Sequence, residues 1–193
     1  MQETILLEVM ANSTWNNQPS NKNFLSPTGF KFILNKAPKV DFYSNSANIP
    51  AIALGSALQT RYGKNIPIAG DKMEFADFNL RFLVDENLEN YMQIWTWMTG
   101  LGFPESLEQY KDLVNSVDPL IPYENISREF FEESDGTLQI LNSNFNPSIS
   151  VLFQGLFPIS LSALEFDATE ENINYFTAQV NFKYTYYSFK SNV

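Results

Sequence analysis

Hydrophobic and polar residues alternate along the segment Asp77–Asp85. Alternation at every second position is the pattern of a β-strand with one buried face. The apolar positions of this segment are Phe78, Leu80, Phe82 and Val84. The opposite face carries Asn79 and Arg81, with Leu83 as the apolar exception. We therefore predict a half-buried strand here.

The segment that follows has the period of an amphipathic helix. Its apolar residues recur at steps of three and four, as Leu88, Tyr91, Met92, Trp95 and Met98. Such steps place side chains on one helical face. Two acidic residues before the segment suit a helix N-terminus, and two glycines followed by a proline suit its end. We predict a helix over about residues 87–99, with Tyr91, Trp95 and Met98 facing the core.

Further short apolar segments predict an antiparallel β protein. Before the helix we expect strands at Phe30–Leu34, Val40–Tyr43 and Lys64–Ile68, a weakly charged connection at Asn45–Leu58, and a turn at Ala69–Lys72. After the helix we expect a short helix at Ser106–Val114, strands at Thr137–Leu141 and Ser148–Phe153, a break at Gly155–Pro158, and a strand at Ile159–Phe166. Pro50 confines its connection to a sheet edge or a loop, because proline lacks the amide hydrogen that an inner strand needs.

The clearest alternation lies near the end of the chain, at Tyr175–Phe189. One face of the predicted strand carries Phe176, Ala178, Val180, Phe182, Tyr184 and Tyr186. The other face is polar and carries Thr177, Gln179, Asn181, Lys183 and Thr185. We predict one long strand with a polar face.

This order of elements predicts a single mainly β domain over residues 1–193, an antiparallel β-sandwich or barrel with one packed helix. A chain of this length can bury a full core as one domain. Residues 1–28 are polar and rich in asparagine, which predicts an N-terminal arm. Residues 105–135 predict a surface insertion after the helix. Its acidic half is compatible with a solvated surface and with an acidic contact or lumen surface.

The residue types that the chain lacks exclude several chemistries. Without histidine or cysteine it has no Ser-His or Cys-His nucleophilic pair, no disulfide, and no imidazole or thiolate metal site. No carboxylate spacing singles out a catalytic pair, so we expect no catalytic residue, cofactor or metal, and an enzyme using Glu129, Glu132 and Glu133 ranks last. The net charge of −10 disfavours a protein that grips nucleic acid phosphates, although a solubilising surface explains this charge equally well. No apolar run is long enough to span a membrane.

Three segments, in this order, resemble the tail tube proteins of contractile-tailed bacteriophages of the T-even type. The first is NFLSPTGFKFIL, Asn23–Leu34, a strand that follows a polar arm. The second, Ile66–Met98, resembles the family's AGD turn, aromatic-rich strand, acidic corner and single helix. The third, Phe153–Phe189, resembles its Gly-aromatic-Pro segment, short apolar strand, acidic turn and long aromatic final strand.

This resemblance implies a non-enzymatic subunit that forms hexameric rings, which stack into a hollow tube inside the tail sheath. The implied bore is acidic, houses the tape-measure protein, and later conducts genomic DNA without specific binding. Further implied partners are the baseplate hub and the tail terminator, and no membrane is involved. The implied location is the phage tail of the virion, after assembly in the host cytoplasm. The arm and the insertion exceed an ordinary tube subunit, so a baseplate tube initiator with the same fold is an alternative.

The tube hypothesis assigns roles to two sets of residues. Candidates for the channel lining are the polar faces of two predicted strands: Asn79, Arg81, Thr177, Gln179, Asn181, Lys183 and Thr185. Candidates for stacking contacts are Ile49, Pro50, Ile52, Leu54 and Leu58. The polar faces are equally compatible with bulk solvent around a monomer. An alternative of a different class is a soluble carbohydrate-binding or decoration β-sandwich, with Tyr184, Tyr186 and Tyr187 stacked on sugars.

Overall fold

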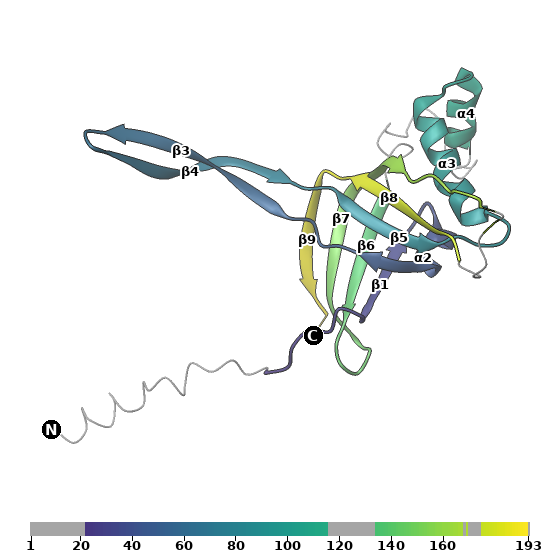
Figure 1. Cartoon of the computed structure of the whole chain (residues 1–193), viewed down its shortest axis with the longest axis horizontal. Coiled ribbons are helices and arrows are strands. Elements are labelled where there is room, and N and C mark those ends of the chain that lie inside the picture. The colour runs from purple at the N-terminus through teal and green to yellow at the C-terminus, as the bar shows by residue number, and fades with distance from the viewer. Residues whose placement is uncertain (1–21, 116–133, 168, 170–174, 193) are drawn as a thin grey trace.

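The computed structural model describes residues 22–115, 134–167, 169 and 175–192. Figure 1 shows a large sheet, a projecting two-stranded ribbon and a pair of helices. The first half contains β1 (Phe30–Leu34), α2 (Pro38–Phe42), β2 (Ser44–Ala47), β3 (Ile52–Arg61), β4 (Lys64–Phe75) and β5 (Phe78–Leu83). The second half contains α3 (Glu89–Gly102), α4 (Leu107–Asn115), β6 (Ser134–Leu141), β7 (Pro147–Leu161), β8 (Thr177–Lys183) and β9 (Tyr186–Ser191). The predicted mainly antiparallel β fold is therefore confirmed. Residues 1–21 of the expected arm and 116–133 of the expected insertion lie outside the described residues.

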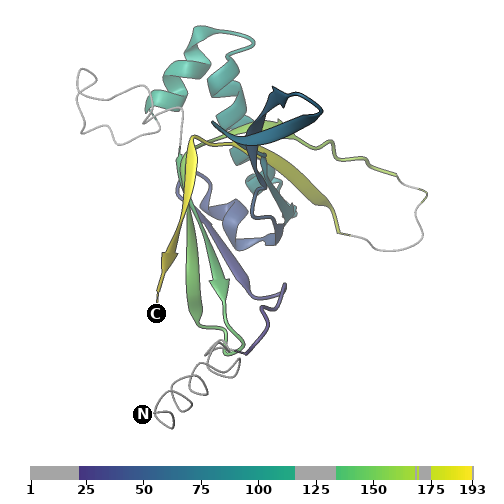
Figure 2. The same cartoon turned by 90° about the vertical axis from the view of Figure 1, so that its left-hand side faces the viewer.

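The seven-stranded sheet is organised by β7, because its two halves pair with different strands. The strand order is β1-β6-β7-β8-β5-β2, and β9 also pairs with β7. The first half of β7 lies between β6 and β9, whereas β8 pairs with its end at Phe157–Leu161. Figure 2 shows the purple and green strands β1, β6 and β7 running together, while β8 crosses away from them. The sheet therefore changes direction along β7.

The core lies where this sheet curves over itself. Phe78 of β5 packs against Phe32 of β1 with 5.1 Å between ring centroids, although three strands separate β1 from β5 in the strand order. Phe78 also lies 4.6 Å from Phe153 of β7 and 6.0 Å from Phe182 of β8. All four rings are fully buried. Strands from both ends of the sheet thus share one aromatic core.

The helix α3 covers one side of this core, and α4 packs against the last turn of α3. Ile94 and Trp97 of α3 are buried, and the Trp97 ring lies 6.1 Å from Phe182. Gly100 allows α4 to approach closely, because a Cβ at this position would lie 2.7 Å from the Cβ of Leu113. The prediction of the long helix is confirmed, and that of the short helix at 106–114 is confirmed as α4.

The predicted face of α3 is partly wrong. Tyr91 and Met98 pack against the core as expected, but Trp95 is 53% exposed. Trp97, two residues later and on another side of the helix, is the buried tryptophan. The physical reason is that α3 turns Ile94 and Trp97 toward the sheet, which leaves Trp95 on its outer face.

Four other local predictions are wrong. Residues 40–42 lie in α2 and not in a strand, because Pro38 starts a helical turn there. The predicted turn at residues 69–72 lies inside β4, and the real turn is at Tyr62 and Gly63, where Gly63 has φ of +76°. The predicted break at residues 155–158 lies inside β7, which changes partners there without ending. The predicted connection at residues 45–58 contains most of β2 and most of β3.

Candidate functional site

Four neighbouring strand segments, β2, β5, β8 and the end of β7, form one amphipathic sheet. Its buried face carries fully enclosed side chains of β5 and β8: Phe78, Leu80, Phe82, Ala178, Val180 and Phe182. Alternation places on the opposite face six residues that the sequence singled out: Asn79, Arg81, Thr177, Gln179, Asn181 and Lys183. Asn79 lies directly opposite Asn181, and Arg81 lies opposite Gln179. The sheet thus has one core face and one polar face, which we call the polar face below.

The seventh candidate, Thr185, lies beyond the end of β8. Its backbone N–H donates to the carbonyl of Gln154 at 2.9 Å, so the chain has left the β5 pairing at this point. The single long strand predicted at the end of the chain is therefore wrong. The segment divides into β8 and β9. Even-numbered residues are buried in β8, but in β9 the odd-numbered Tyr187 is buried and Tyr186 is half exposed.

Hydrogen bonds link the polar face to its neighbouring segments. The side-chain Oδ1 of Asn48, just after β2, accepts from the backbone N–H of Asn79 at 2.6 Å. On the other side, the hydroxyl of Ser162 accepts from the backbone N–H of Gln179 at 2.9 Å. The amide of Gln179 donates to Oδ1 of Asn181 at 3.3 Å. Amides and hydroxyls, rather than charges, therefore make up most of this face.

The charges of the polar face are few and do not make it acidic. Lys183 forms an ion pair with Asp77 at 2.5 Å between Nζ and Oδ1. Arg81 is exposed, and no ion pair joins it to another described residue. The described residues of this face therefore give it a small positive charge. This differs from the acidic lining that the resemblance implies.

A tyrosine-rich cluster holds the base of the β3–β4 ribbon. Phe75, the last residue of β4, lies 5.7–6.1 Å from the rings of Tyr184, Tyr186 and Tyr187. The Tyr187 hydroxyl donates to the carbonyl of Pro50 at 3.0 Å, and the Tyr184 hydroxyl donates to the carbonyl of Ala76 at 2.8 Å. Burial raises the pKa of Tyr184 to about 12. Two of the three tyrosines proposed as sugar platforms thus serve the ribbon base.

The β3–β4 ribbon contains three of the candidate stacking residues, Ile52, Leu54 and Leu58, and all of them are exposed. Ile49 is exposed just before the ribbon, whereas Pro50 is buried at its base. Sequence reasoning missed that the ribbon projects from the sheet, as Figure 1 shows. The available signal was the Tyr62-Gly63 pair between two extended segments, because a two-residue loop ending in glycine favours a hairpin.

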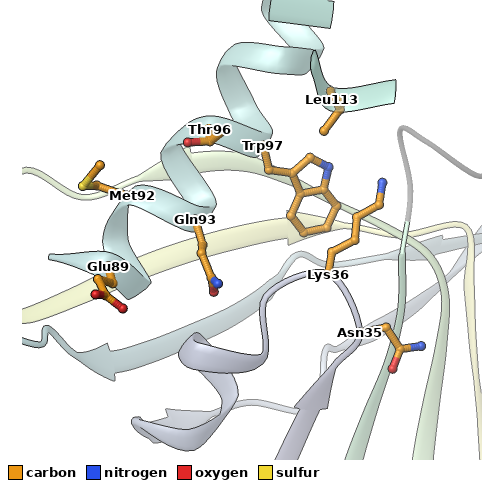
Figure 3. Close-up of a pocket in the computed structure, with 8 residues that line it drawn as sticks. All are labelled: Asn35, Lys36, Glu89, Met92, Gln93, Thr96, Trp97 and Leu113. Atoms are coloured by element: carbon orange, nitrogen blue, oxygen red, sulfur yellow. The ribbon is translucent and has the colours of Figure 1, made fainter. Parts of the chain in front are cut away.

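A cavity of about 550 Å³ lies between α3, α4 and the β1–α2 turn (Figure 3). Figure 3 shows Lys36 reaching toward the Trp97 ring, with its Nζ 5.0 Å from the ring centroid. The Glu89 carboxylate at the cavity edge pairs with Lys39. Among the described residues, no group of three or more metal-ligating side chains comes together, in this cavity or elsewhere. No helix in the described part of the chain is long and apolar enough to cross a membrane.

Comparison with solved structures defines the class of fold. Over 89% of this chain and 97% of the other, it matches a subunit of the anti-feeding prophage (AFP) baseplate with a TM-score of 0.57 at 12% identity. It also matches a subunit of the AFP tube-terminating cap (TM-score 0.55, 14% identity, 93% and 99% covered). A third match is to the PVC sheath-tube complex of an extracellular contractile injection system (TM-score 0.52, 16% identity, 93% and 99% covered). The chain therefore has the fold of subunits found in contractile injection systems.

The sequence itself gives the family. The family described as phage tail tube protein matches residues 15–190, which is most of the chain. This protein therefore belongs to the phage tail tube protein family, as the resemblance predicted. A search of curated proteins returned no relative.

Proposed function

We propose that this chain is a structural subunit that forms hexameric rings, and that the rings stack into the inner tube of a contractile phage tail. The observation that carries this proposal is the amphipathic sheet of β2, β5, β8 and the end of β7, in which β5 and β8 turn mostly polar side chains away from the core. Membership of the tail tube family and the shared fold with contractile injection system subunits support it. In the ring, the polar face of every subunit borders a central channel.

Ring closure uses the two open edges of this sheet. Within the described residues, β2 pairs with a strand on one side only, and so does the end of β7 at Phe157–Leu161. An open edge presents unpaired backbone N–H and C=O groups and is a template for another strand. Pairing the β2 edge of one subunit with the β7 end of the next removes both edges and closes the ring.

The polar face suits a channel through which cargo slides. Asn79, Gln179 and Asn181 offer amides that water can solvate, and Arg81 is the one described charge on the face without an ion-pair partner. Strong binding of nucleic acid needs many clustered cations, because affinity grows with the number of phosphates neutralised. The channel therefore passes the tape-measure protein and then genomic DNA without holding either. In this proposal the tube belongs to the tail of the virion. The tail sheath surrounds it, and the baseplate hub and the tail terminator bind its two ends.

Negative-stain electron microscopy with mass photometry tests the ring and the tube directly. Six-fold rings or hollow tubes from purified protein are the expected result. Particles that stay monomeric at every concentration, with and without a tail baseplate as template, would contradict the proposal. Rings that elongate only on a baseplate would favour the tube initiator, a second function that the structural match to a baseplate subunit supports.

Cysteine labelling tests which face borders the channel, since the chain has no native cysteine. In assembled tubes, Asn79→Cys and Asn181→Cys should react with a small maleimide and resist a bulky polymer-linked one. Lys31→Cys, on the exposed outer face of β1, is the matched control and should react with both. Free reaction of Asn79→Cys with the bulky reagent in intact tubes would place the polar face outside.

Truncation tests the expected role of the N-terminal arm, of which residues 1–21 lie outside the described residues. A variant lacking residues 1–22 should keep its fold, because β1 and the core begin later in the chain. We expect it to form rings that stack poorly. If this variant forms tubes of unchanged length, the arm does not contribute to ring stacking.

A further inference from the structure

The polar face of the sheet carries a positive charge that the described residues leave unpaired. Arg81 is exposed in β5, and no ion pair or side-chain hydrogen bond joins its guanidinium to another described residue. The second cation of the face, Lys183, is paired with Asp77. Among the described residues of this face, Arg81 is therefore the cation that can bind an anion from outside the subunit.

The side chains around Arg81 are neutral and form hydrogen bonds. In the strand register, Arg81 lies opposite Gln179 of β8 on one side and opposite Ser46 of β2 on the other. Asn79 and Asn181 face each other one step further along the same side of the sheet. Residues that face each other across paired strands have neighbouring side chains. Arg81 therefore lies among amides and a hydroxyl, and we call these five residues the arginine patch.

The arginine patch has the chemistry of a phosphate contact. A guanidinium presents N–H donors in a planar fork that matches two oxygens of one phosphate. Serine, asparagine and glutamine are among the other side chains that commonly donate to phosphates in DNA complexes, and such contacts do not depend on base sequence. A DNA strand supplies phosphate oxygens in a regular row, whereas the carboxylates of a protein segment are irregularly spaced. The patch as a whole therefore favours DNA over an acidic protein.

No unpaired carboxylate lies on the described strands of the polar face. The carboxylate of Asp77 is neutralised by Lys183. The next acidic residues beyond this sheet, Glu165 and Asp167, belong to the segment after β7 and lie past the residues that pair with β8. A phosphate that approaches Arg81 therefore meets neutral donors around the cation.

We propose that Arg81 contacts the phosphates of DNA that passes along the channel, so that the bore attracts DNA weakly at this level. In a ring of six copies, rotational symmetry places the six arginines at one height. These contacts guide the duplex without a strong grip, because affinity grows with the number of phosphates neutralised and each copy supplies one cation. This inference rests on the proposed function, because the polar face has to border a channel. It goes beyond that function by naming the residue, the chemical group that it contacts and the sign of the interaction.

Co-sedimentation of a short labelled DNA duplex with assembled tubes tests the contact. Wild-type tubes should retain the duplex at low salt and release it as salt is added. We expect the logarithm of the binding constant to fall against the logarithm of the salt concentration with a slope of about −3 to −5, since each neutralised phosphate contributes about −0.9. Arg81→Gln should lower retention roughly tenfold at low salt and flatten this slope. Equal retention by Arg81→Gln and wild-type tubes would overturn the proposal.

Two further variants separate a phosphate contact from a change of net charge. Lys31→Gln removes one cation at an exposed position of β1, outside the polar face, and should retain DNA as the wild type does. A loss as large as that of Arg81→Gln would show that net charge alone is responsible and would refute the contact. Arg81→Lys keeps the charge but not the planar fork, so its retention should lie between those of the wild type and Arg81→Gln. Retention no better than that of Arg81→Gln would contradict attraction by the cation.

A labelled polyglutamate peptide in the same assay tests the alternative of an acidic protein segment. If the tubes retain this peptide and not the duplex, the assignment to phosphate is wrong. Electron microscopy and circular dichroism of Arg81→Gln test a second alternative, a contact between copies. If this variant keeps its fold but no longer assembles, Arg81 is an assembly contact and the inference is wrong.

The outcomes also separate this inference from the proposed function. Wild-type tubes that form but do not retain the duplex at low salt would refute the inference and leave the tube function intact. If the wild type forms neither rings nor tubes with any template, the tube function is wrong and the inference falls with it.

Discussion

Asn90 joins the end of β5 to the start of α3, and its replacement tests how the sheet holds the helices. The side chain is fully buried. Its Nδ2 donates to the carbonyl of Leu83 at 2.7 Å. Its Oδ1 accepts from the backbone N–H of Asp85 at 3.3 Å and of Tyr91 at 2.8 Å. Both ends of the amide therefore serve the backbone where strand changes to helix.

Asn90→Ala should lower the free energy of unfolding by about 2–4 kcal/mol, since each lost hydrogen bond contributes about 0.5–1.5 kcal/mol and orphaned buried groups add to the loss. Asn90→Asp is the matched control. It keeps an oxygen toward the N–H groups of Asp85 and Tyr91 but turns a second acceptor toward the carbonyl of Leu83. The ionised variant should therefore be at least as unstable as the alanine variant at pH 7.

The pH dependence of Asn90→Asp follows from burial. Burial without a partner charge raises the pKa of a carboxyl group in the folded state above its unfolded value of about 3.9. A group of this kind favours the folded state most below the unfolded pKa, and this advantage is lost as the pH rises through the folded pKa. The protonated carboxyl can also donate to Leu83. The variant should therefore approach wild-type stability near pH 4 and fall away toward neutrality, whereas Asn90→Ala should keep a constant deficit.

Urea denaturation followed by circular dichroism measures all three proteins, and equal slopes confirm that the same unfolding reaction is compared. A loss below about 0.5 kcal/mol for Asn90→Ala would refute the reasoning, because such a value is typical of an exposed position. A deficit of Asn90→Asp that does not change with pH would show that the site is open to water.

Three further predictions concern packing and the ribbon base. Gly100→Ala should destabilise by about 1–3 kcal/mol, because its Cβ would meet the Cβ of Leu113 at 2.7 Å, and a smaller residue at 113 should relieve part of the loss in a thermal unfolding experiment. Trp97→Ala should cost about 3–5 kcal/mol in urea denaturation. Trp95→Ala should cost far less because its ring is 53% exposed, and equal costs would contradict the observed burial of these tryptophans. Tyr187→Phe should lower stability by about 1 kcal/mol and increase amide hydrogen exchange in β3, since it removes a hydrogen bond at the ribbon base.

The strands β5 and β8 could be predicted because one face of each packs against the core of the same chain and the other face does not. In β5 and β8 every second side chain enters the core, so alternation in the sequence matches burial in the structure. The division between β8 and β9 could not be found in the same way. Near this division both faces of the predicted strand carry tyrosines, Tyr184 and Tyr186 on one and Tyr187 on the other. The alternation of apolar and polar residues therefore does not show that Tyr187 is the buried one.

Trp95 and Trp97 show a similar limit for helices. Apolar residues lie on several sides of α3, so its period predicts a helix but does not select the side that meets the sheet. The neighbouring elements decide this: the ring of Trp97 packs near Phe182. Gly70 shows a limit of turn signals. A Cβ there would lie 2.5 Å from the carbonyl oxygen of Gly55, so this glycine permits a close strand approach inside the ribbon and does not make a turn.

The ribbon was missed because nothing inside the subunit buries it. Strand prediction assumes that an apolar face meets the core of the same chain, and neither face of β3 does so. A closed antiparallel dimer would place one ribbon face on the partner and leave the other face in water. Covering both faces requires contact with more than one other copy, which favours extended assembly over a dimer. Mass photometry distinguishes these alternatives, because a population that ends at dimers would show that one covered face is enough.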